Sequence, residues 1–408
     1  MIEIKDKSLC CGCNTCMQRC PQRCITMRED GEGFLYPQID ALMCIDCGLC
    51  ERICPVLNQN KSKQPLHVFA AKNKNEEQRL RSSSGGIFIL LAEQIIRKGG
   101  VVFGARFDEN WEVEHCYVET IKELDSLMRS KYVQSRIGNT YKETEEFLKQ
   151  GRQVLFVGTP CQIAGLRKFL RKEYDNLFAV DFVCHGVPSP LVWRRYLAEV
   201  KEQFLRSEGA GKKSGLPFSL KSTPVIVGIN FREKQRRGYS WKKFGFVVCT
   251  KSSLKGDQNS VLLSTKFYEN EYMQAFLGDM ILRPSCHTCP ARRGKSHSDI
   301  TIGDHWAISS ICPDFDDDKG NSLVFVNTEK GEVFWPKEHL QFIETDFIAS
   351  RMYNGGFSDV VKKHPHRDRF FRKLKKTENL CLLIQKELKV PLYERVIRKI
   401  LNIGKRNY

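Results

Sequence analysis

The sequence predicts an α/β main body with a mixed sheet, preceded by a small cysteine-rich α+β domain at the N-terminus. Three observations lead to this fold class. Eight cysteines fall in two identical runs before residue 60. Strand-like and helix-like segments then alternate from about residue 66 to 330, as in α/β folds. Two of these strands end in a cysteine, at the sheet edge where ligands bind in such folds.

The two cysteine runs share one spacing. They read Cys10-x-x-Cys13-x-x-Cys16-x-x-x-Cys20-Pro21 and Cys44-x-x-Cys47-x-x-Cys50-x-x-x-Cys54-Pro55. This doubled spacing is typical of a bacterial-type ferredoxin module with two [4Fe-4S] clusters, in which the fourth thiolate of each run reaches the other cluster. We therefore assign Cys10, Cys13, Cys16 and Cys54 to one cluster, and Cys20, Cys44, Cys47 and Cys50 to the second.

The alternatives for these cysteines are a zinc ribbon and a disulfide knot. Four thiolates suffice for one zinc ion, so the doubled run with both prolines is the more specific signal. Cys11 and Cys24 fall outside the spacing, and we expect them to be packed small residues.

Composition limits the class of protein. The 408 residues suffice for two or three domains, and no run of 18 apolar residues predicts a membrane span. The N-terminus lacks the layout of a signal peptide, so cluster-forming thiols indicate a reducing cytoplasm. The net charge is +17, of which residues 362–408 carry +11. This basic tail is consistent with three interpretations: an acidic partner protein, peripheral contact with an anionic membrane, or a solvated segment. We expect no nucleic acid partner.

The chain order predicts four regions. We expect a two-cluster ferredoxin domain over 1–60, the N-terminal part of the α/β region over 66–150, its C-terminal part over 151–330, and a basic, helical extension over 331–408. We also expect a polar linker at 58–65, after the ferredoxin domain, and a flexible insertion at 207–222, within the third region.

Two polar segments lie in the first part of the α/β region. Ser83, Ser84, Gly85 and Gly86 precede an apolar helix at 87–96, and exposed backbone N–H groups there would suit a phosphate. An ordinary helix start with a flexible turn is the alternative. Lys131, Tyr132, Gln134 and Ser135 form a polar turn after a helical segment at 121–129.

Two successive strands end in cysteines. A strand at 153–158 is followed by Thr159-Pro160-Cys161-Gln162, and a strand at 177–183 by Cys184-His185-Gly186. Cys286-x-x-Cys289 would complete four thiolates, and we predict a third [4Fe-4S] cluster there. Alternatively, Cys161 and Cys184 are buried structural cysteines, Cys286 and Cys289 form half a zinc site or a redox pair, or Cys312 is the fourth ligand.

These motifs resemble one known family. The ordered segments Ser83–Gly86, Ser130–Ser135, Gly158–Gln162, Cys184–Pro190 and Cys286–Cys289 are similar to the family of beta subunits of coenzyme F-420 hydrogenases and dehydrogenases, over roughly residues 66–330. The resemblance implies FAD (or FMN) beside the clusters. Carried over residue by residue, the flavin contacts would be Ser83, Ser84, Gly85, Gly86, Lys131, Tyr132, Gln134, Ser135, Gly158, Thr159, Pro160 and Gln162.

The predicted function is that of an iron–sulfur flavoprotein oxidoreductase. Electrons would pass between ferredoxin-type clusters and a flavin, which reduces or oxidises a small molecule. A soluble ferredoxin or another electron-transfer protein would be the partner. His185 is the candidate proton donor, with a structural role as its alternative. The alternatives for the whole chain are one component of a deazaflavin-dependent oxidoreductase and a non-catalytic electron-transfer component of a larger complex.

Overall fold

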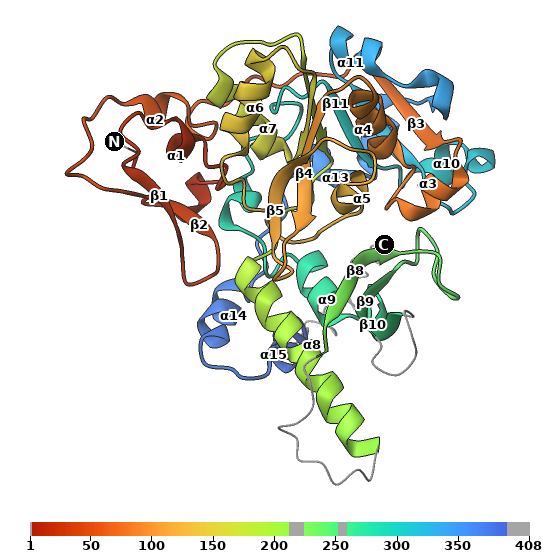
Figure 1. The fold of residues 1–408 in the computed structure, drawn as a ribbon. Coiled ribbons are helices and arrows are strands. Elements are labelled where there is room, and N and C mark those ends of the chain that lie inside the picture. Colours follow the sequence, from red (N-terminus) through yellow and green to blue (C-terminus); the bar gives the residue numbers. More distant parts are fainter. Residues whose placement is uncertain (1, 212–223, 252–258, 390–408) are drawn as a thin grey trace, which may run out of the picture.

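An eight-stranded mixed sheet forms the centre of the molecule (Figure 1). The computed structural model describes residues 2–211, 224–251 and 259–389. The strand order is β13-β3-β12-β11-β7-β6-β4-β5, and β4, β6, β7 and β11 run parallel. The strands are β3 (His67–Asn73), β4 (Val101–Phe107), β5 (Val113–Val118), β6 (Val154–Gly158), β7 (Leu177–Phe182), β11 (Ile300–Asp304), β12 (Ser322–Val326) and β13 (Leu340–Glu344).

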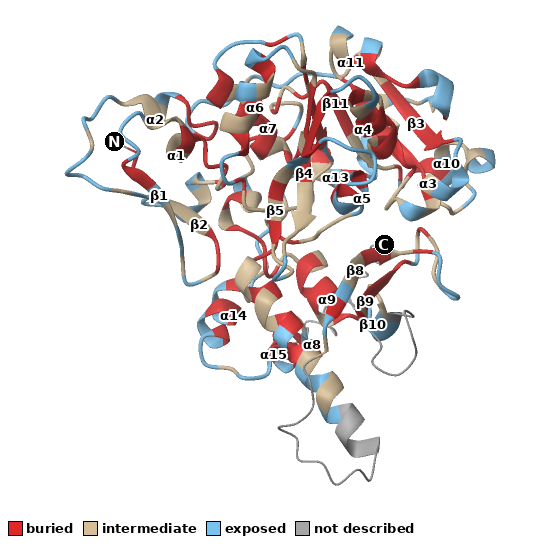
Figure 2. Cartoon of the chain, viewed as in Figure 1, coloured by how far each residue is buried: buried red, intermediate tan, exposed pale blue. Residues whose placement is uncertain are grey.

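Helices cover both faces of this sheet, because alternate strand residues are apolar on both sides. Val102 and Leu155 face α4 (Ile87–Arg97), whereas Val101 and Phe103 face α6 (Thr140–Lys149) and α7 (Pro160–Leu170). The strands β3, β6, β7 and β12 are accordingly buried along most of their length, whereas the edge strand β13 is largely exposed (Figure 2). Shorter helices complete the main body: α3 (Glu76–Arg81), α5 (Leu124–Leu127), α10 (Ile308–Ile311), α11 (Glu329–Phe334), α12 (Phe347–Met352) and α13 (Gly355–Ser358). Short 3₁₀ turns also belong to it: η3 (Pro284–Thr288), η4 (Pro313–Phe315) and η5 (Lys337–His339).

The N-terminal cysteine-rich part packs against one side of the main body (Figure 1). It contains η1 (Lys7–Leu9), α1 (Thr15–Arg19), the antiparallel pair β1 (Ile25–Glu29) and β2 (Leu35–Ile39), and α2 (Leu49–Arg52). Helix α1 lies against α7, whose first turn carries Cys161. The ferredoxin-like fold and the α/β main body are therefore both as the sequence predicts.

A second lobe lies below the sheet in Figure 1. Its strands β8 (Ile226–Glu233), β9 (Gly245–Lys251) and β10 (Asn259–Lys266) form an antiparallel sheet. The helices α8 (Pro190–Gly211), α9 (Glu271–Leu277), α14 (Arg367–Leu374) and α15 (Leu380–Leu388) pack on an aromatic core that includes Trp193, Phe231 and Tyr272.

Several elements differ from the sequence predictions. The helix expected at 121–129 is only α5, because the backbone is already extended at Met128 and has a φ of 71° at Arg129. The extension expected to be helical contains a strand as well, since β13 pairs antiparallel with β3 at the sheet edge. Most of the predicted insertion and the end of the tail lie outside the described residues. The central sheet takes its strands from the segment between residues 67 and 344. The limits of the four predicted regions stay predictions.

Candidate functional site

The first cysteine set lies where the N-terminal part meets the main body. Cys13 and Cys54 are buried, and Cys10 and Cys16 are partly buried. Burial and the neighbouring thiols of Cys13, Cys10 and Cys54 raise the pKa of Cys16 well above its usual range. The four predicted ligands of one cluster are thus gathered within electrostatic reach of one another.

The second cysteine set lies farther from the main body. Cys20, Cys44, Cys47 and Cys50 line one small cavity, and Asp46 is the charged residue among its lining residues. Cys24 packs there too, with its sulfur 3.4 Å from that of Cys20. Cys47 is exposed, so this set lies close to solvent.

The third cysteine set lies at the carboxyl edge of the central sheet. Cys161 is in the first turn of α7 after β6, and Cys184 follows β7. Cys286 lies in η3 and accepts a hydrogen bond from the Val187 amide at 3.4 Å. Burial and the thiols of Cys286, Cys161 and Cys289 raise the pKa of Cys184, so the structure brings these four together. Cys312 packs instead against Ala70, Trp241 and Ile308.

The chemistry of these donors suits cubane clusters. Across residues 2–211, 224–251 and 259–389, no three histidine, cysteine or carboxylate side chains converge as ligands of a single metal ion. Four thiolates held around a larger centre are the donor set of a [4Fe-4S] cluster, whereas a zinc ribbon closes its ligands on one ion.

Cys11 connects the first and third sets. It is buried, and its thiol is within hydrogen-bonding reach of both Cys13 and Cys161. The bond from Cys11 lowers the pKa of Cys13 to about 6 and also lowers the pKa of Cys161. The sequence predicts Cys11 to be a packed residue, and it is packed between two candidate ligand sets.

A hydrogen-bonded network adjoins the third set. Gln162 donates to the Ser135 hydroxyl at 2.9 Å, and its own oxygen accepts from the Thr159 amide at 2.8 Å. The Ser135 hydroxyl lies 2.8 Å from Nδ1 of His115 on β5. Burial lowers the pKa of His115 to about 4. Three predicted flavin residues therefore share one network, and His115 is a member that sequence reasoning missed.

The other predicted flavin residues lie in the loop at 83–86, in the turn at 131–135 and at the end of β6. Ser83 accepts a hydrogen bond from the Ser130 amide at 2.9 Å, which places this loop beside the 131–135 turn. The Gly85 amide, however, donates to the hydroxyl of Ser322 at 3.0 Å, so it is already satisfied. Burial lowers the pKa of Lys131 to about 7, and its amine donates to the Met128 carbonyl at 2.8 Å. Gly158 and Pro160 flank Thr159 at the end of β6.

Arg232 is a buried cation, and two of its nitrogen atoms have no hydrogen-bond partner among the described residues. It lies at the end of β8 and not in an exposed basic loop, because it packs between Phe244 and Trp306, 4.5 and 5.2 Å from their ring centres. It pairs with Asp304, yet its Nε and Nη2 atoms are buried without a hydrogen-bond partner in the described part of the chain. Burial lowers the pKa of the nearby Lys234 to about 7.

His185 has an acidic partner. Its Nε2 atom lies 2.7 Å from Oδ1 of Asp279, and its ring meets Phe276 edge-on at 5.1 Å between ring centres. Phe276 in turn contacts the ring of Tyr132 at 4.7 Å. The candidate proton donor is therefore separated by the Phe276 ring from Tyr132, one of the predicted flavin residues.

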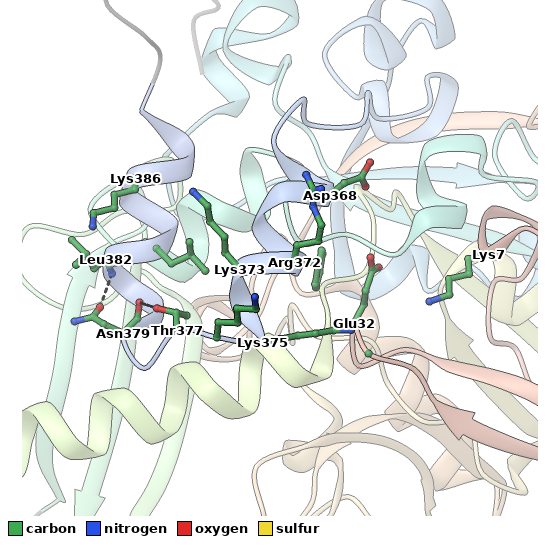
Figure 3. A pocket seen from close by; sticks show the side chains of 14 residues that line it. Lys7, Glu32, Asp368, Arg372, Lys373, Lys375, Thr377, Asn379, Leu382 and Lys386 are labelled. Carbon is green, nitrogen blue, oxygen red and sulfur yellow. Dashed lines mark hydrogen bonds between the residues drawn. The ribbon is translucent and has the colours of Figure 1, made fainter.

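A basic groove of about 920 Å³ opens between α14, α15 and the turn at 31–32 of the N-terminal part (Figure 3). Two acidic residues, Glu32 and Asp368, line it. Six basic residues line it as well: Lys7, Arg372, Lys373, Lys375, Lys376 and Lys386. We call this surface the basic groove.

Comparison with family models gives two matches. Residues 9–58 match the 4Fe-4S dicluster domain. Residues 151–214 and 218–348 match the model for the C-terminal part of the beta subunit of coenzyme F420 hydrogenase/dehydrogenase. The chain therefore contains a region of this family and a dicluster domain. The match to the beta-subunit model includes Cys161, Cys184, Cys286 and Cys289, and the dicluster match includes both N-terminal cysteine sets.

Relatives of the chain are found among characterised proteins. The chain is 25% identical over 248 residues to "Coenzyme F420-dependent sulfite reductase" of Methanocaldococcus jannaschii, covering 57% of this chain and 38% of that protein. It is 27% identical over 177 residues to a subunit of F(420)H(2) dehydrogenase from Methanosarcina mazei, covering 40% and 49%. It thus spans less than half the length of these two relatives.

A structural comparison gives a chain of the F420-reducing [NiFe] hydrogenase complex from Methanosarcina barkeri. The TM-score is 0.43 at 14% identity, over 84% of this chain and 95% of that one. The two family-model matches together establish an iron–sulfur protein related to oxidoreductases. In the described parts of the chain, no helix is both long enough and apolar enough to cross a bilayer.

Proposed function

We propose that this protein is an iron–sulfur flavoprotein oxidoreductase that passes electrons between ferredoxin-type clusters and a flavin. The observation that carries the proposal is the position of Cys11, in contact with Cys13 of the first set and Cys161 of the third. Two cluster sites separated by one cysteine side chain form a continuous route from the N-terminal part to the edge of the central sheet.

Twelve thiolates would hold three [4Fe-4S] clusters. The first two are those of the dicluster domain, and the third would be held by Cys161, Cys184, Cys286 and Cys289. The route then runs from the second set through the first set to the third. Its outer end is near solvent at Cys47.

A flavin fits the carboxyl edge of the sheet because of the unsatisfied donors there. Arg232 already pairs with Asp304, but among the described residues its Nε and Nη2 atoms are buried without hydrogen-bond partners, and such donors would suit a further acceptor such as a phosphate. Lys234 lies close to Arg232, and an anion there would favour its charged form. We propose FAD as the flavin, with FMN as its alternative; when bound, it interconverts single electrons and a hydride.

This chain's own residues would position the substrate and move its proton. The Ser135–Gln162–Thr159 network holds the end of β6 in one arrangement, next to Cys161. Asp279 would orient the His185 ring through the contact at Nε2. His185 would then hold the proton delivered to or taken from the substrate.

Two other functions stay open for this chain. Both relatives bear names that include F420, and Arg232 and Lys234 would also suit the phosphate-bearing tail of a deazaflavin. One relative is named as part of a multi-subunit dehydrogenase, which favours a relay that works only within a complex. A cytoplasmic location is part of the proposal, and the tail proposed to touch a membrane extends beyond the described residues.

We further propose that the basic groove receives an acidic electron carrier such as a soluble ferredoxin. Six basic residues against two acidic ones give it a strong positive field, which steers acidic proteins. Lys7 of the groove lies over the Tyr36 ring, and this ring also contacts Arg283 beside Cys10. A carrier bound here would therefore lie close to the first cysteine set.

Metal and flavin content test the function directly. Anaerobically purified protein is expected to hold about twelve irons and one flavin per chain. Cys286→Ala should reduce this to about eight irons, while Cys312→Ala, which changes a cysteine outside the third set, should keep about twelve. About eight irons in all three proteins would remove the third cluster, and zinc without flavin would refute the oxidoreductase.

A further inference from the structure

Arg283 is a fully buried cation at the junction of the N-terminal part and the main body. Its side chain donates from Nε to the Cys10 carbonyl at 2.8 Å and from Nη2 to the Leu35 carbonyl at 2.8 Å. Nη1 donates to Oε1 of Gln134 at 2.9 Å. Nη2 also points at the Cys10 sulfur, 3.7 Å away.

The backbone of Arg283 belongs to the third cysteine set. Its amide donates to the Val187 carbonyl at 2.9 Å, and its carbonyl accepts from the Cys286 amide at 2.9 Å. One residue therefore orders the loop of one proposed cluster while its side chain reaches a ligand of another. Sequence reasoning missed this role, because Cys10 and Arg283 are far apart in the chain.

Among the residues that the structure describes, no carboxylate neutralises this cation. Its contacts there are carbonyl oxygens, an amide oxygen, the Cys10 sulfur and the rings of Phe34 and Tyr36. A buried charge without a counter-charge is strongly destabilising. A negative charge on the Cys10 sulfur, as in a thiolate that binds an iron–sulfur cluster, would supply the counter-charge.

We infer that Arg283 is the counter-ion of the iron–sulfur cluster held by Cys10, Cys13, Cys16 and Cys54, and that it raises the reduction potential of that cluster. The inference rests on the proposed cluster ligands. A cubane with four thiolates is an anion, and it becomes more negative when it takes up an electron. A fixed cation and an N–H···S hydrogen bond stabilise the reduced form more than the oxidised form.

The geometry holds the guanidinium in this place. Gly12 has a φ of +70°, and a Cβ there would lie 2.8 Å from Nη1 of Arg283. A glycine at this position of the cysteine run thus leaves room for the cation.

Redox titration followed by electron paramagnetic resonance tests the inference on the whole chain. Arg283→Met should lower the ratio of reduced to oxidised first cluster about tenfold at a fixed potential, which corresponds to about 59 mV for one electron. Arg283→Lys keeps the charge and should lie within about threefold of the wild type. Arg367→Gln is the matched control, because Arg367 is also buried but pairs with the carboxylate of Glu32.

The outcomes separate this inference from the proposed function. Clusters at full iron content with unchanged potential in Arg283→Met would overturn the role of Arg283 and leave the clusters in place. If Arg283→Met loses iron, Arg283→Lys decides: an about tenfold lower ratio in this charged variant would refute the counter-ion. Absence of iron from the wild-type protein would refute the cluster assignment and, with it, the counter-ion.

Discussion

Gly165 of α7 lies against Cys13 of the N-terminal part: a Cβ added at Gly165 would be 2.9 Å from the Cβ of Cys13 and 2.8 Å from the Thr15 hydroxyl. Thr15 also donates to the Gly165 carbonyl at 3.0 Å. This close approach brings the helix that carries Cys161 up to the first cysteine set.

Gly165→Ala should therefore weaken the docking of the two parts. Overpacking of this kind costs about 1–3 kcal/mol of unfolding free energy. Chemical denaturation of the iron-loaded protein measures it. Gly355→Ala is the control, because the nearest atom to its added Cβ is 3.8 Å away; equal stability of the two variants would contradict the close approach.

Arg232→Met should release flavin. Loss of charge-assisted hydrogen bonds is expected to weaken flavin binding about tenfold to a hundredfold. Flavin fluorescence in a titration of the flavin-free protein gives the dissociation constant. Arg236→Met removes an exposed arginine nearby and should bind flavin as the wild type does. Unchanged binding in Arg232→Met would place the flavin phosphate elsewhere.

His185→Gln should slow turnover about a hundredfold with an artificial reductant, because general acid catalysis typically contributes at least that much. Iron and flavin content should not change. Asp279→Asn should alter the pH profile of turnover, since the carboxylate faces the histidine ring. His339→Gln changes an exposed histidine as the control. Full activity of the His185→Gln variant would mean that His185 has only a structural role.

Reversing charge in the basic groove should slow the reaction with an acidic ferredoxin. The double variant Lys375→Glu, Lys376→Glu is expected to associate about tenfold more slowly at low salt, and the difference should shrink as ionic strength rises. Stopped-flow reduction measures the rate. Lys98→Glu with Lys122→Glu makes the same change of charge outside the groove. If both double variants slow equally, the groove is not the docking surface.

Acid should destabilise the fold through His115. Its pKa is about 4 in the folded protein against an ordinary 6.5, so the unfolded chain binds the extra proton first as pH falls. Unfolding free energy should therefore fall between about pH 6.5 and 4, by about 3 kcal/mol in total. His115→Gln should show a shallower decline than the wild type in denaturant titrations. His339→Gln, at an exposed histidine, should keep the wild-type slope; the same slope in all three would contradict the buried neutral ring.

The grouping of the cysteines into three sets could be predicted from sequence because the information for it is local. The spacing within each N-terminal run is set by the shape of one cluster, and Cys161 and Cys184 follow strands that are recognisable from their apolar residues. Neighbouring parallel strands end at the same edge, so the two cysteines could be expected to meet. Only the pair Cys286 and Cys289 had to be added to these two cysteines to complete the third set.

The residues that sequence reasoning missed act across long separations. His115 is on β5, a strand in which polar residues alternate with other residues. Its contact with Ser135 depends on how β5 lies against the turn at 131–135. Arg232 precedes a run of basic residues in the sequence, which gives no sign that its side chain is buried. Its burial depends on Trp306 and Asp304, which no local pattern connects to it.

The pairing of Glu32 with Arg367 has a consequence for biosynthesis. The turn that carries Glu32 is translated early, whereas the arginine that pairs with it belongs to α14, near the other end of the chain. The N-terminal part therefore leaves the ribosome long before its final contact exists. The proposed clusters can therefore be inserted at the eight cysteines of the first and second sets during that interval, before the completed fold buries Cys13.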